Sequence, residues 1–571
     1  MLNSNKKLET LRHSAAHLLA HAIQELYPDT LFTIGPATEE GFFYDVLPSK
    51  NFKEDCLPLL EKKMHEIALR NLPLTHQNMA KEDAKRLFNH NKFKLELIDG
   101  IEGDFVGIAR QGDFVDLCKG GHVENTNQIQ HVKLLHISGS YWRADKNGQP
   151  LQRISGTAFW TEKELLEYVQ KKEDALKYDH RRIGKALDLF SFQEEGPGFP
   201  FYHPNGKLIL NILTDHLKKL LLKYGHVEIS TPAMLSDELW RRSGHYQFYK
   251  DNMYFCSIDE KEYAVKPMNC PGAILVYNDR PHSYKELPLR YAEFGHVHRY
   301  ELSGVMHGLF RARAFTQDDA HIFCMPEQLN KEIVSLIQLH RELIDPFGFK
   351  TSVRVATKPA KSLGSDHLWE IATNALIDGL KQEQYPYDIA QGEGAFYGPK
   401  IEFHLLDSMG RSWQCGTIQV DFFQSENFDL SYISTEGKKE RPVIIHRALY
   451  GSMERFFGIL LEHYKGKLPF WLAPVQIKIL SITDEQKSYA YSIAQYLKSY
   501  NIRVAVDESS DQISGQIKAA CAQGIPWALV LGKKEMAQNT VTLRYADGKQ
   551  EFNLSLEKLI QKAQQTITDF L

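Results

Sequence analysis

The sequence has few cysteines, and none is spaced as a disulfide framework or a CxxC motif would be. The seven cysteines of the 571-residue chain stand singly, at positions 56, 118, 256, 270, 324, 415 and 521. This usage is typical of a reducing compartment, where a cysteine is free, a metal ligand or a nucleophile. No apolar run reaches about 18 residues, and the N-terminus lacks the apolar core of a signal peptide. We therefore expect a cytoplasmic protein without a membrane segment.

An excess of basic residues is also missing. The formal net charge is −4, with 25% charged and 43% apolar residues, as in an ordinary globular protein. Any nucleic-acid site must then be a local basic surface. The length predicts roughly three to four domains.

The pattern of predicted elements changes twice along the chain. Helical spacing over residues 8–27, a helix near 53–71 and mixed structure up to about 160 come first. The charged stretch 161–190 predicts a solvated connecting helix. Long helices and strands follow, and short apolar strands then alternate with helices as in a small α/β domain. These changes predict a division into 1–160, a linker at 161–180, 181–468 and 469–571.

Histidines near the N-terminus form the first candidate site. The segment HSAAHLLAH places three of them on one helix face: His13, His17 and His21. Cys118 and His122 lie four residues apart downstream, with Asp116 nearby. Together His13, His17, Cys118 and His122 predict a metal site or a hydrolytic pocket. A chance HxxxH pair remains the alternative, because the chain has 24 histidines.

Arginines of the middle region form a second candidate site. Arg299 and Glu301 are expected two apart on one strand, and so on one face. Such a pair can bind a phosphate while its carboxylate accepts from an amine. Arg311 and Arg455, the latter in a helix after a Gly-Ser turn, complete a set without local acidic partners that suits a triphosphate. Surface salt bridges are the alternative.

A lone cysteine raises a separate question. Cys270 stands in VKPMNCPGAI before a Pro-Gly pair and has no CxxC partner. Most lone cysteines are buried small hydrophobic residues.

Several segments resemble class II aminoacyl-tRNA synthetases. Arg299-Tyr-Glu301 with HGLFRARAFTQDDAHIF, and then YGSMERFFG, resemble motifs 2 and 3, and ISTPAML with Pro232 resembles motif 1. More closely, the threonyl-tRNA synthetase family is matched in order and spacing by KPMNCPG, RAFTQDDAHIF, GEGAFYGPKIEF, QCGTIQVDF and IHRALYGSMERF. The N-terminal HSAAHLLAHAI, GFFYD and DLCKGGH resemble that family's editing domain, which is related to that of the alanyl enzyme. Nearly the whole chain is covered.

The resemblance implies an α+β multidomain protein. Its parts would be an α+β editing domain (1–160), a linker helix, a class II antiparallel-sheet catalytic core (181–468) and an α/β anticodon-binding domain (469–571). The implied reactions are activation of threonine with ATP, transfer to tRNA(Thr) and hydrolysis of mischarged seryl-tRNA(Thr). A homodimer through the region of Pro232 is also implied. Two departures are expected: the sequence has no match to the ubiquitin-like domain often found at the family's N-terminus, and Ala273 replaces a histidine of MNCPGH.

The resemblance also answers the question of Cys270. It implies one Zn²⁺ in the amino-acid pocket, held by Cys270, His321 and His446. Three protein ligands leave coordination positions open, and a metal that needs an oxygen ligand would reject valine. Serine lacks only a methyl group, worth about 1–3 kcal/mol, so a second, hydrolytic site is expected.

The remaining implied residues fall into four groups. Arg299 is expected at the α-phosphate, Glu301 at the adenine amine, and Arg311 and Arg455 at the outer phosphates of Mg²⁺-bound ATP. Around threonine we expect Met268, Gln317, Asp319, Tyr397 and Gln419. Around the editing cluster, which we expect to work without metal, the resemblance adds Tyr44, Lys94 and Asp116. Lys400 is expected on the tRNA or phosphate side, and Glu535 and Arg544 on anticodon bases.

Two other functions remain open at this point. One is a non-catalytic paralogue that binds tRNA or a tRNA-like mRNA as a regulator, which would have no use for the arginines and the Cys/His/His set. The other is a class II synthetase for proline or serine. A zinc ion has no task in a proline pocket, so the Cys/His/His set argues against that enzyme.

Overall fold

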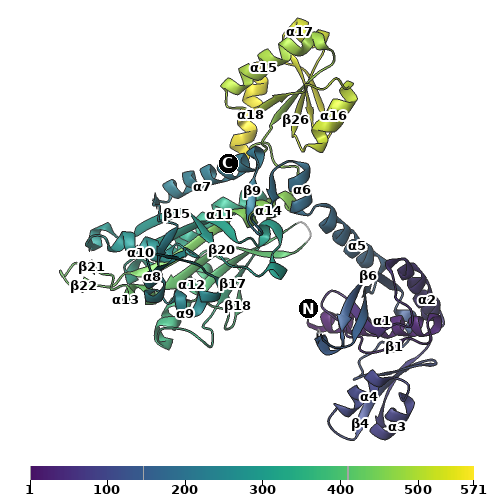
Figure 1. Cartoon of the computed structure of the whole chain (residues 1–571). Helices are drawn as coiled ribbons and strands as arrows, with labels where there is room; N and C mark the ends of the chain where they lie inside the picture. The colour runs from purple at the N-terminus through teal and green to yellow at the C-terminus, as the bar shows by residue number, and fades with distance from the viewer. Residues whose placement is uncertain (1, 146, 408–409, 571) are drawn as a thin grey trace. The chain divides into compact units, whose positions relative to one another are not determined.

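The computed structural model describes residues 2–145, 147–407 and 410–570, which form two compact units, Met1–Asp174 and Ala175–Leu571 (Figure 1). We call them unit 1 and unit 2. Within the described ranges, none of the helices combines the length and the apolar character that crossing a bilayer requires.

Unit 1 packs one long helix and a second helix on a four-stranded sheet. Its elements are α1 (Leu2–Leu26), β1 (Leu31–Phe32), β2 (Phe42–Leu47), α2 (Leu57–Leu69), β3 (Leu74–Ala80), α3 (Lys81–Leu87), α4 (Lys92–Asp99), β4 (Phe105–Gln111), β5 (Phe114–Leu117), β6 (His131–Tyr141), β7 (Pro150–Phe159) and most of α5 (Glu162–Lys177), whose end belongs to unit 2. The described strands form the sheets β1-β2-β7-β6 and β3-β4-β5. Leu11, Leu18 and Ile23 of α1 are fully buried in the core that α2 and the first sheet share.

Unit 2 contains a larger antiparallel sheet and a smaller mixed one. The elements in the first part of unit 2, up to His463, are α6 (His180–Ala186), β8 (Phe190–Phe192), β9 (Pro200–Tyr202), α7 (Pro204–Lys223), β10 (Val227–Glu228), β11 (Met234–Ser236), α8 (Asp237–Arg242), α9 (His245–Tyr249), β12 (Tyr254–Ile258), β13 (Lys261–Val265), α10 (Cys270–Asn278), β14 (His282–Ser283), β15 (Leu289–His298), β16 (Ala314–Cys324), α11 (Leu329–Ile344), β17 (Lys350–Ala356), α12 (Asp366–Gln382), β18 (Asp388–Ala390), β19 (Lys400–Leu406), β20 (Ser412–Asp421), α13 (Phe423–Asn427), β21 (Tyr432–Ile433), β22 (Lys439–Glu440), β23 (Val443–Ser452) and α14 (Met453–His463). The rest are β24 (Ile477–Ser481), α15 (Lys487–Ser499), β25 (Val504–Val506), α16 (Ile513–Ala522), β26 (Trp527–Leu531), α17 (Lys533–Gln538), β27 (Val541–Tyr545), β28 (Gln550–Leu554) and α18 (Leu556–Phe570).

The large sheet has the strand order β10-β15-β16-β23-β20-β19-β17-β18 among the described residues. Its pairs are antiparallel except at the edges, where β10 runs parallel to β15 and β18 to β17. Apolar side chains of α11, α12 and α14 join those of the strands in one core. One row across the sheet matters for the site: Tyr291, His321, His446 and Gln419 are successive cross-strand partners on β15, β16, β23 and β20.

The smaller sheet has the order β25-β24-β26-β27-β28, parallel at first and then antiparallel, with α15, α16 and α18 around it (Figure 1). Each unit contains an antiparallel or largely antiparallel sheet with helices beside it, and unit 2 also contains this α/β sheet. The predicted α+β multidomain class is therefore confirmed.

Two local predictions were wrong. Strand β15 ends at His298, so Arg299 and Glu301 do not lie on it; the Tyr300 amide donates to the Asn252 carbonyl, 2.9 Å away, instead of continuing the ladder. The connecting helix predicted over 161–190 is interrupted: α5 ends at Lys177, and Asp179 caps the separate helix α6. The Pro-Gly pair after Cys270 lies in the first turn of α10.

Candidate active sites

Three side chains of unit 2 meet at the row that crosses the large sheet. We call Cys270, His321 and His446 the donor cluster; their ligand atoms lie within 4.8 Å of one another, and all three residues are buried. His321 and His446 face each other on β16 and β23, and Cys270 begins α10. The sheet register therefore pairs the two imidazoles, and the helix start supplies the thiol.

The polar contacts of the donor cluster fit a metal ion. His321 Nε2 is buried and has no hydrogen-bond partner among the described residues. Burial lowers the pKa of His321 well below its ordinary value and raises the pKa of the Cys270 thiol. His446 Nε2 lies 2.9 Å from Asp421 Oδ2, a contact that orients the ring. One sulfur and two imidazole nitrogens form the donor set that Zn²⁺ prefers.

His245 also contacts this site, and no sequence pattern pointed to it. Its Nε2 atom lies 3.0 Å from Met268 Sδ and 3.8 Å from Cys270 Sγ. Burial lowers the pKa of His245 to about 3, so the ring is neutral near pH 7. No spacing rule links it to Cys270, because α9 reaches the cluster only through tertiary packing.

The residues expected around threonine lie beside the donor cluster. Asp319, on β16, accepts from Asn269 Nδ2 at 3.2 Å, and burial raises the pKa of Asp319 to about 6. Gln419 is the cross-strand partner of His446 and donates to the Gly398 carbonyl.

The other residues predicted to contact threonine lie on several segments. The Tyr397 ring centroid lies 5.5 Å from that of His446, and Met268 Sδ contacts His245, which in turn contacts Cys270. Gln317 lies on β16 at a register shift opposite β23. Lys400 forms an ion pair with Glu402, 2.7 Å away.

The predicted arginines gather in space although they are far apart in sequence. Arg299 Nε donates to the Pro267 carbonyl, and its guanidinium lies 5.0 Å from the Phe315 ring centroid. Arg455 Nε and Nη1 donate to the carbonyls of Phe310 and Gln414, at 3.0 and 3.2 Å.

The local charge of this group is positive. Burial lowers the pKa of Arg455, and the nearby charges of Arg299 and Arg311 lower it further. One prediction was wrong: Arg311 does have an acidic partner, because its Nε lies 2.9 Å from Glu301 Oε2. Glu301 is therefore placed to orient Arg311.

In unit 1, the four predicted donors come together. The ligand atoms of His13, His17, Cys118 and His122 lie within 4.8 Å of one another. Cys118 Sγ is 3.1 Å from His122 Nε2 and 3.5 Å from His13 Nε2. We call these four residues the histidine cluster. His21 lies outside it and contacts Gln111 Nε2 at 2.9 Å.

A buried charge network supports the histidine cluster. Asp116 accepts from Tyr44 OH at 2.5 Å, forms an ion pair with Lys94 and lies 3.4 Å from His17 Nδ1. Burial would raise the pKa of Asp116, but Lys94 and His17 outweigh it and hold the pKa below its ordinary value. A cavity of about 560 Å³ is lined by these residues together with His13 and Cys118.

The imidazoles of the cluster are neutral near pH 7. Burial lowers the pKa of His17 to about 4, and burial with the neighbouring histidines lowers that of His122 to about 3. A neutral imidazole can accept a proton from water, as general-base catalysis requires. His76, which sequence reasoning missed, contacts the Cys118 carbonyl through Nε2 at 3.1 Å.

The two predicted anticodon contacts lie in the C-terminal sheet region. Glu535 accepts from the Gly532 amide and from Thr542 Oγ1, so its carboxylate caps α17. Arg544 lies on β27 and is half-buried.

Comparisons with known proteins agree with this architecture. The model for the "tRNA synthetase class II core domain (G, H, P, S and T)" matches residues 254–464, and the "Anticodon binding domain" matches 472–566. The "Threonyl and Alanyl tRNA synthetase second additional domain" matches 106–155. Unit 2 thus contains the catalytic core of a class II aminoacyl-tRNA synthetase.

Similar proteins show which family of class II synthetases the chain belongs to. The threonine–tRNA ligase of Clostridium tetani is 47% identical over 97% of this chain and 87% of its own length. That of Clostridium botulinum (strain 657 / Type Ba4) is 48% identical over 98% and 88%. The chain belongs to the threonine–tRNA ligase family. A crystal structure of the RNA binding domain of threonyl-tRNA synthetase from Cryptosporidium parvum Iowa II is 40% identical, with a TM-score of 0.66 over 68% of this chain and 98% of that one.

Proposed function

We propose that this chain is an ATP-dependent threonine–tRNA ligase that also hydrolyses mischarged seryl-tRNA(Thr). The donor cluster of Cys270, His321 and His446 beside Asp319 is the observation that carries the proposal. It offers a metal-binding set and, close to Cys270, an anionic group for an ammonium. We propose the same four-part division, with editing at 1–160, a linker at 161–180, catalysis at 181–468 and anticodon binding at 469–571.

The donor cluster would hold one Zn²⁺. When bound, the ion supplies open coordination positions that the amino and hydroxyl groups of threonine can fill. Asp319 pairs with the ammonium, and Tyr397, Gln317, Gln419 and Met268 surround the rest of the substrate. Valine lacks the hydroxyl oxygen and is rejected.

The arginines would bind Mg²⁺-bound ATP. Arg299 would stabilise charge on the α-phosphate while the threonine carboxylate attacks. Arg455 and Arg311 bind the outer phosphates, and Glu301 accepts from the adenine amine. Lys400 would lie on the tRNA or phosphate side.

The histidine cluster would remove serine from tRNA. Neutral His17 and His122 activate a water molecule or hold the reacting ester, and Asp116 with Lys94 and Tyr44 fixes their surroundings. We propose that this reaction needs no metal. A Cys/His₃ metal site on the same four residues is the competing hypothesis.

The proposed partners follow from the reaction. They are L-threonine, ATP and tRNA(Thr), with Glu535 and Arg544 near the anticodon, in a cytoplasmic homodimer formed through the region of Pro232. In the structure, the Glu535 carboxylate accepts hydrogen bonds from Gly532 and Thr542. A contact between Glu535 and a base must either preserve these two bonds or replace them.

The test is amino-acid-dependent ATP–pyrophosphate exchange with threonine, serine and valine, before and after zinc removal. We expect strong exchange with threonine, weaker exchange with serine, none with valine, and loss of all exchange with the zinc. Metal analysis should find about one zinc per chain. Exchange without zinc would overturn the assigned pocket chemistry, and no exchange with any of the three would favour a tRNA-binding regulator.

A further inference from the structure

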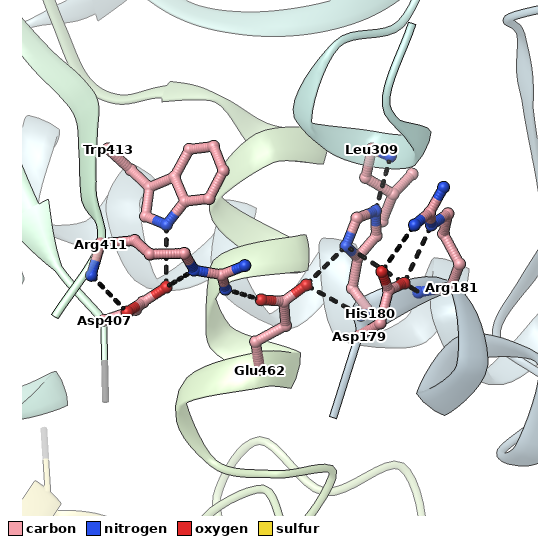
Figure 2. A network of polar contacts seen from close by, with 8 residues as sticks. All are labelled: Asp179, His180, Arg181, Leu309, Asp407, Arg411, Trp413 and Glu462. Carbon is pink, nitrogen blue, oxygen red and sulfur yellow. Dashed lines mark hydrogen bonds and ion pairs between the residues drawn. The ribbon is translucent and has the colours of Figure 1, made fainter. Parts of the chain in front are cut away.

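A chain of buried polar contacts runs from the helix α14 to the loop that precedes β16 (Figure 2). His180 donates to Glu462 Oε1 twice, from its backbone amide at 2.9 Å and from Nδ1 at 2.8 Å. The second oxygen of Glu462 accepts from Arg411, whose Nε donates to Asp407 Oδ2 at 2.7 Å. On its other side, His180 Nε2 lies 3.0 Å from the amide nitrogen of Leu309.

These partners define the protonation of the ring. A carboxylate oxygen at Nδ1 requires a proton there, and an amide N–H at Nε2 requires a lone pair. His180 is therefore neutral in this arrangement, with its proton on Nδ1. Its side chain is fully buried, so no water competes for Nε2.

The charges around His180 are already compensated. Ligand atoms of Asp179, His180 and Glu462 lie close enough to hold a metal ion. However, Asp179 accepts from Arg181 Nε and Nη2, and Glu462 pairs with Arg411. Since each carboxylate has an arginine, the cluster is a hydrogen-bonded network rather than a cation site.

The loop segment that His180 contacts is tightly fitted. The Phe310 ring lies between His180 and Trp413, with centroid distances of 4.1 and 4.2 Å. Gly308 has φ +52°, and a Cβ atom there would lie 2.3 Å from His180 Nε2. Further along the segment, the Phe310 carbonyl accepts from Arg455 Nε at 3.0 Å.

We infer that His180 is a positioning residue for ATP binding, which rests on the proposed function. Its Nε2 fixes segment 308–310, and through the Phe310 carbonyl the segment orients the guanidinium of Arg455. Arg311 follows directly in the chain, so the same anchor restrains a second phosphate-binding candidate. His180 itself lies behind the loop and touches no substrate.

Two substitutions test the contacts of Nδ1 and Nε2 of His180 separately. In His180→Asn, the amide can still reach Glu462 from the position of Nδ1 but offers nothing to the Leu309 amide. In His180→Gln, the longer side chain places a carbonyl oxygen near the position of Nε2. We expect His180→Asn to raise the KM for ATP about tenfold, the loss of roughly one buried hydrogen bond, with the KM for threonine changed less than about twofold. His180→Gln should recover most of the ATP affinity.

Hydrogen exchange supplies a readout that does not depend on catalysis. The Leu309 amide should exchange faster in His180→Asn than in the parent, and His180→Gln should restore its protection. His216→Asn is the control, because His216 is also a buried histidine of unit 2 but its Nε2 has no hydrogen-bond partner among the described residues. It should change neither the KM for ATP nor exchange at Leu309.

The outcomes are distinguishable from failure of the proposed function. If the parent enzyme shows no threonine-dependent exchange, the proposed function fails, while ATP binding by equilibrium dialysis still tests His180. An unchanged affinity for ATP in folded His180→Asn overturns the inference, as does an equal rise in the KM for threonine. If His180→Asn does not fold, Gly308→Ala pushes the segment off His180 from the other side. Weaker ATP binding then supports the inference, and unchanged binding overturns it.

Discussion

His446 Nε2 and Asp421 Oδ2 lie 2.9 Å apart at the end of β20, and both residues are buried. When Nε2–H donates to the carboxylate, the lone pair of the ring remains on Nδ1 for the donor cluster. Asp421 therefore sets both the orientation and the tautomer of a proposed metal ligand.

Replacing Asp421 by asparagine should weaken zinc binding. In Asp421→Asn, the side-chain oxygen can still accept from the Phe423 and Gln424 amides, which bond Oδ1 in the parent, but the charge facing His446 is lost. We expect zinc affinity to fall about 10- to 100-fold, measured by competition with a chelator of known affinity. Asp429→Asn, an exposed acid on a neighbouring turn, should leave the affinity unchanged; equal affinities in both variants would contradict the role of Asp421.

Removing the charge of Asp116 should abolish editing and spare threonine activation. In Asp116→Asn, Lys94 stays buried without its carboxylate and His17 loses the nearby acid, so we expect seryl-tRNA hydrolysis to fall by about 100-fold or more. Deacylation of purified seryl-tRNA measures the first effect, and pyrophosphate exchange measures the second. The exposed Asp113→Asn is the control. Normal deacylation by Asp116→Asn would remove the network from the mechanism.

The phosphate-binding role of Arg455 requires its guanidinium shape. A lysine can reach one of the two carbonyls, Phe310 or Gln414, but cannot donate to both as the planar fork does. We expect Arg455→Lys to raise the KM for ATP at least about tenfold, in steady-state exchange at saturating threonine. The control is Arg341→Lys, at a distant ion pair with Glu383. A KM for ATP unchanged in Arg455→Lys would argue against a phosphate contact.

Stability should fall as the pH drops below 6.5, in part because of His340. Its ring is stacked on Phe403 at 3.7 Å, and burial lowers the pKa of His340 to about 3. Between pH 6.5 and 3 the unfolded chain binds a proton there that the folded chain does not, so acid favours unfolding. This one group contributes a slope of up to about 1.4 kcal/mol per pH unit.

A substitution isolates that slope. The melting temperature of His340→Leu should decrease less between pH 7 and pH 5 than that of the parent, whatever its value at pH 7. Parallel pH profiles for the two proteins would show that burial does not lower the pKa of His340 relative to the unfolded chain.

Parts of this molecule could be predicted from local sequence and parts could not. Helical periodicity places His13 and His17 on one face, and the short distance between Cys118 and His122 keeps them together. The three arginines were proposed as a triphosphate site from the sequence, and the resemblance gave each its role. The donor cluster was assigned by resemblance alone, since nothing local joins Cys270 to strands far along the chain. The roles of these residues stay predictions.

The errors have a common physical cause. The strand predicted through Glu301 takes no account of the Asn252 carbonyl, which accepts from the Tyr300 amide beyond the end of β15. The contact of His245 with Cys270 and the anchor of Leu309 on His180 likewise depend on packing between distant segments. The periodicity of a sequence predicts the faces of one helix or strand at a time. These contacts depend on how two distant segments are positioned relative to each other.

His321 pairs with His446 across the sheet, and His446 pairs with Gln419. This register also determines where the chain can lose a residue without disrupting the donor cluster. A side chain in a strand changes face with every residue, so deleting a single residue within β16 or β23 would turn a histidine away from Cys270. Losing a residue from the exposed turn at 435–438 moves no partner in the row. We therefore expect single-residue deletions to be tolerated in this turn and to disrupt the site when they fall in β16 or β23.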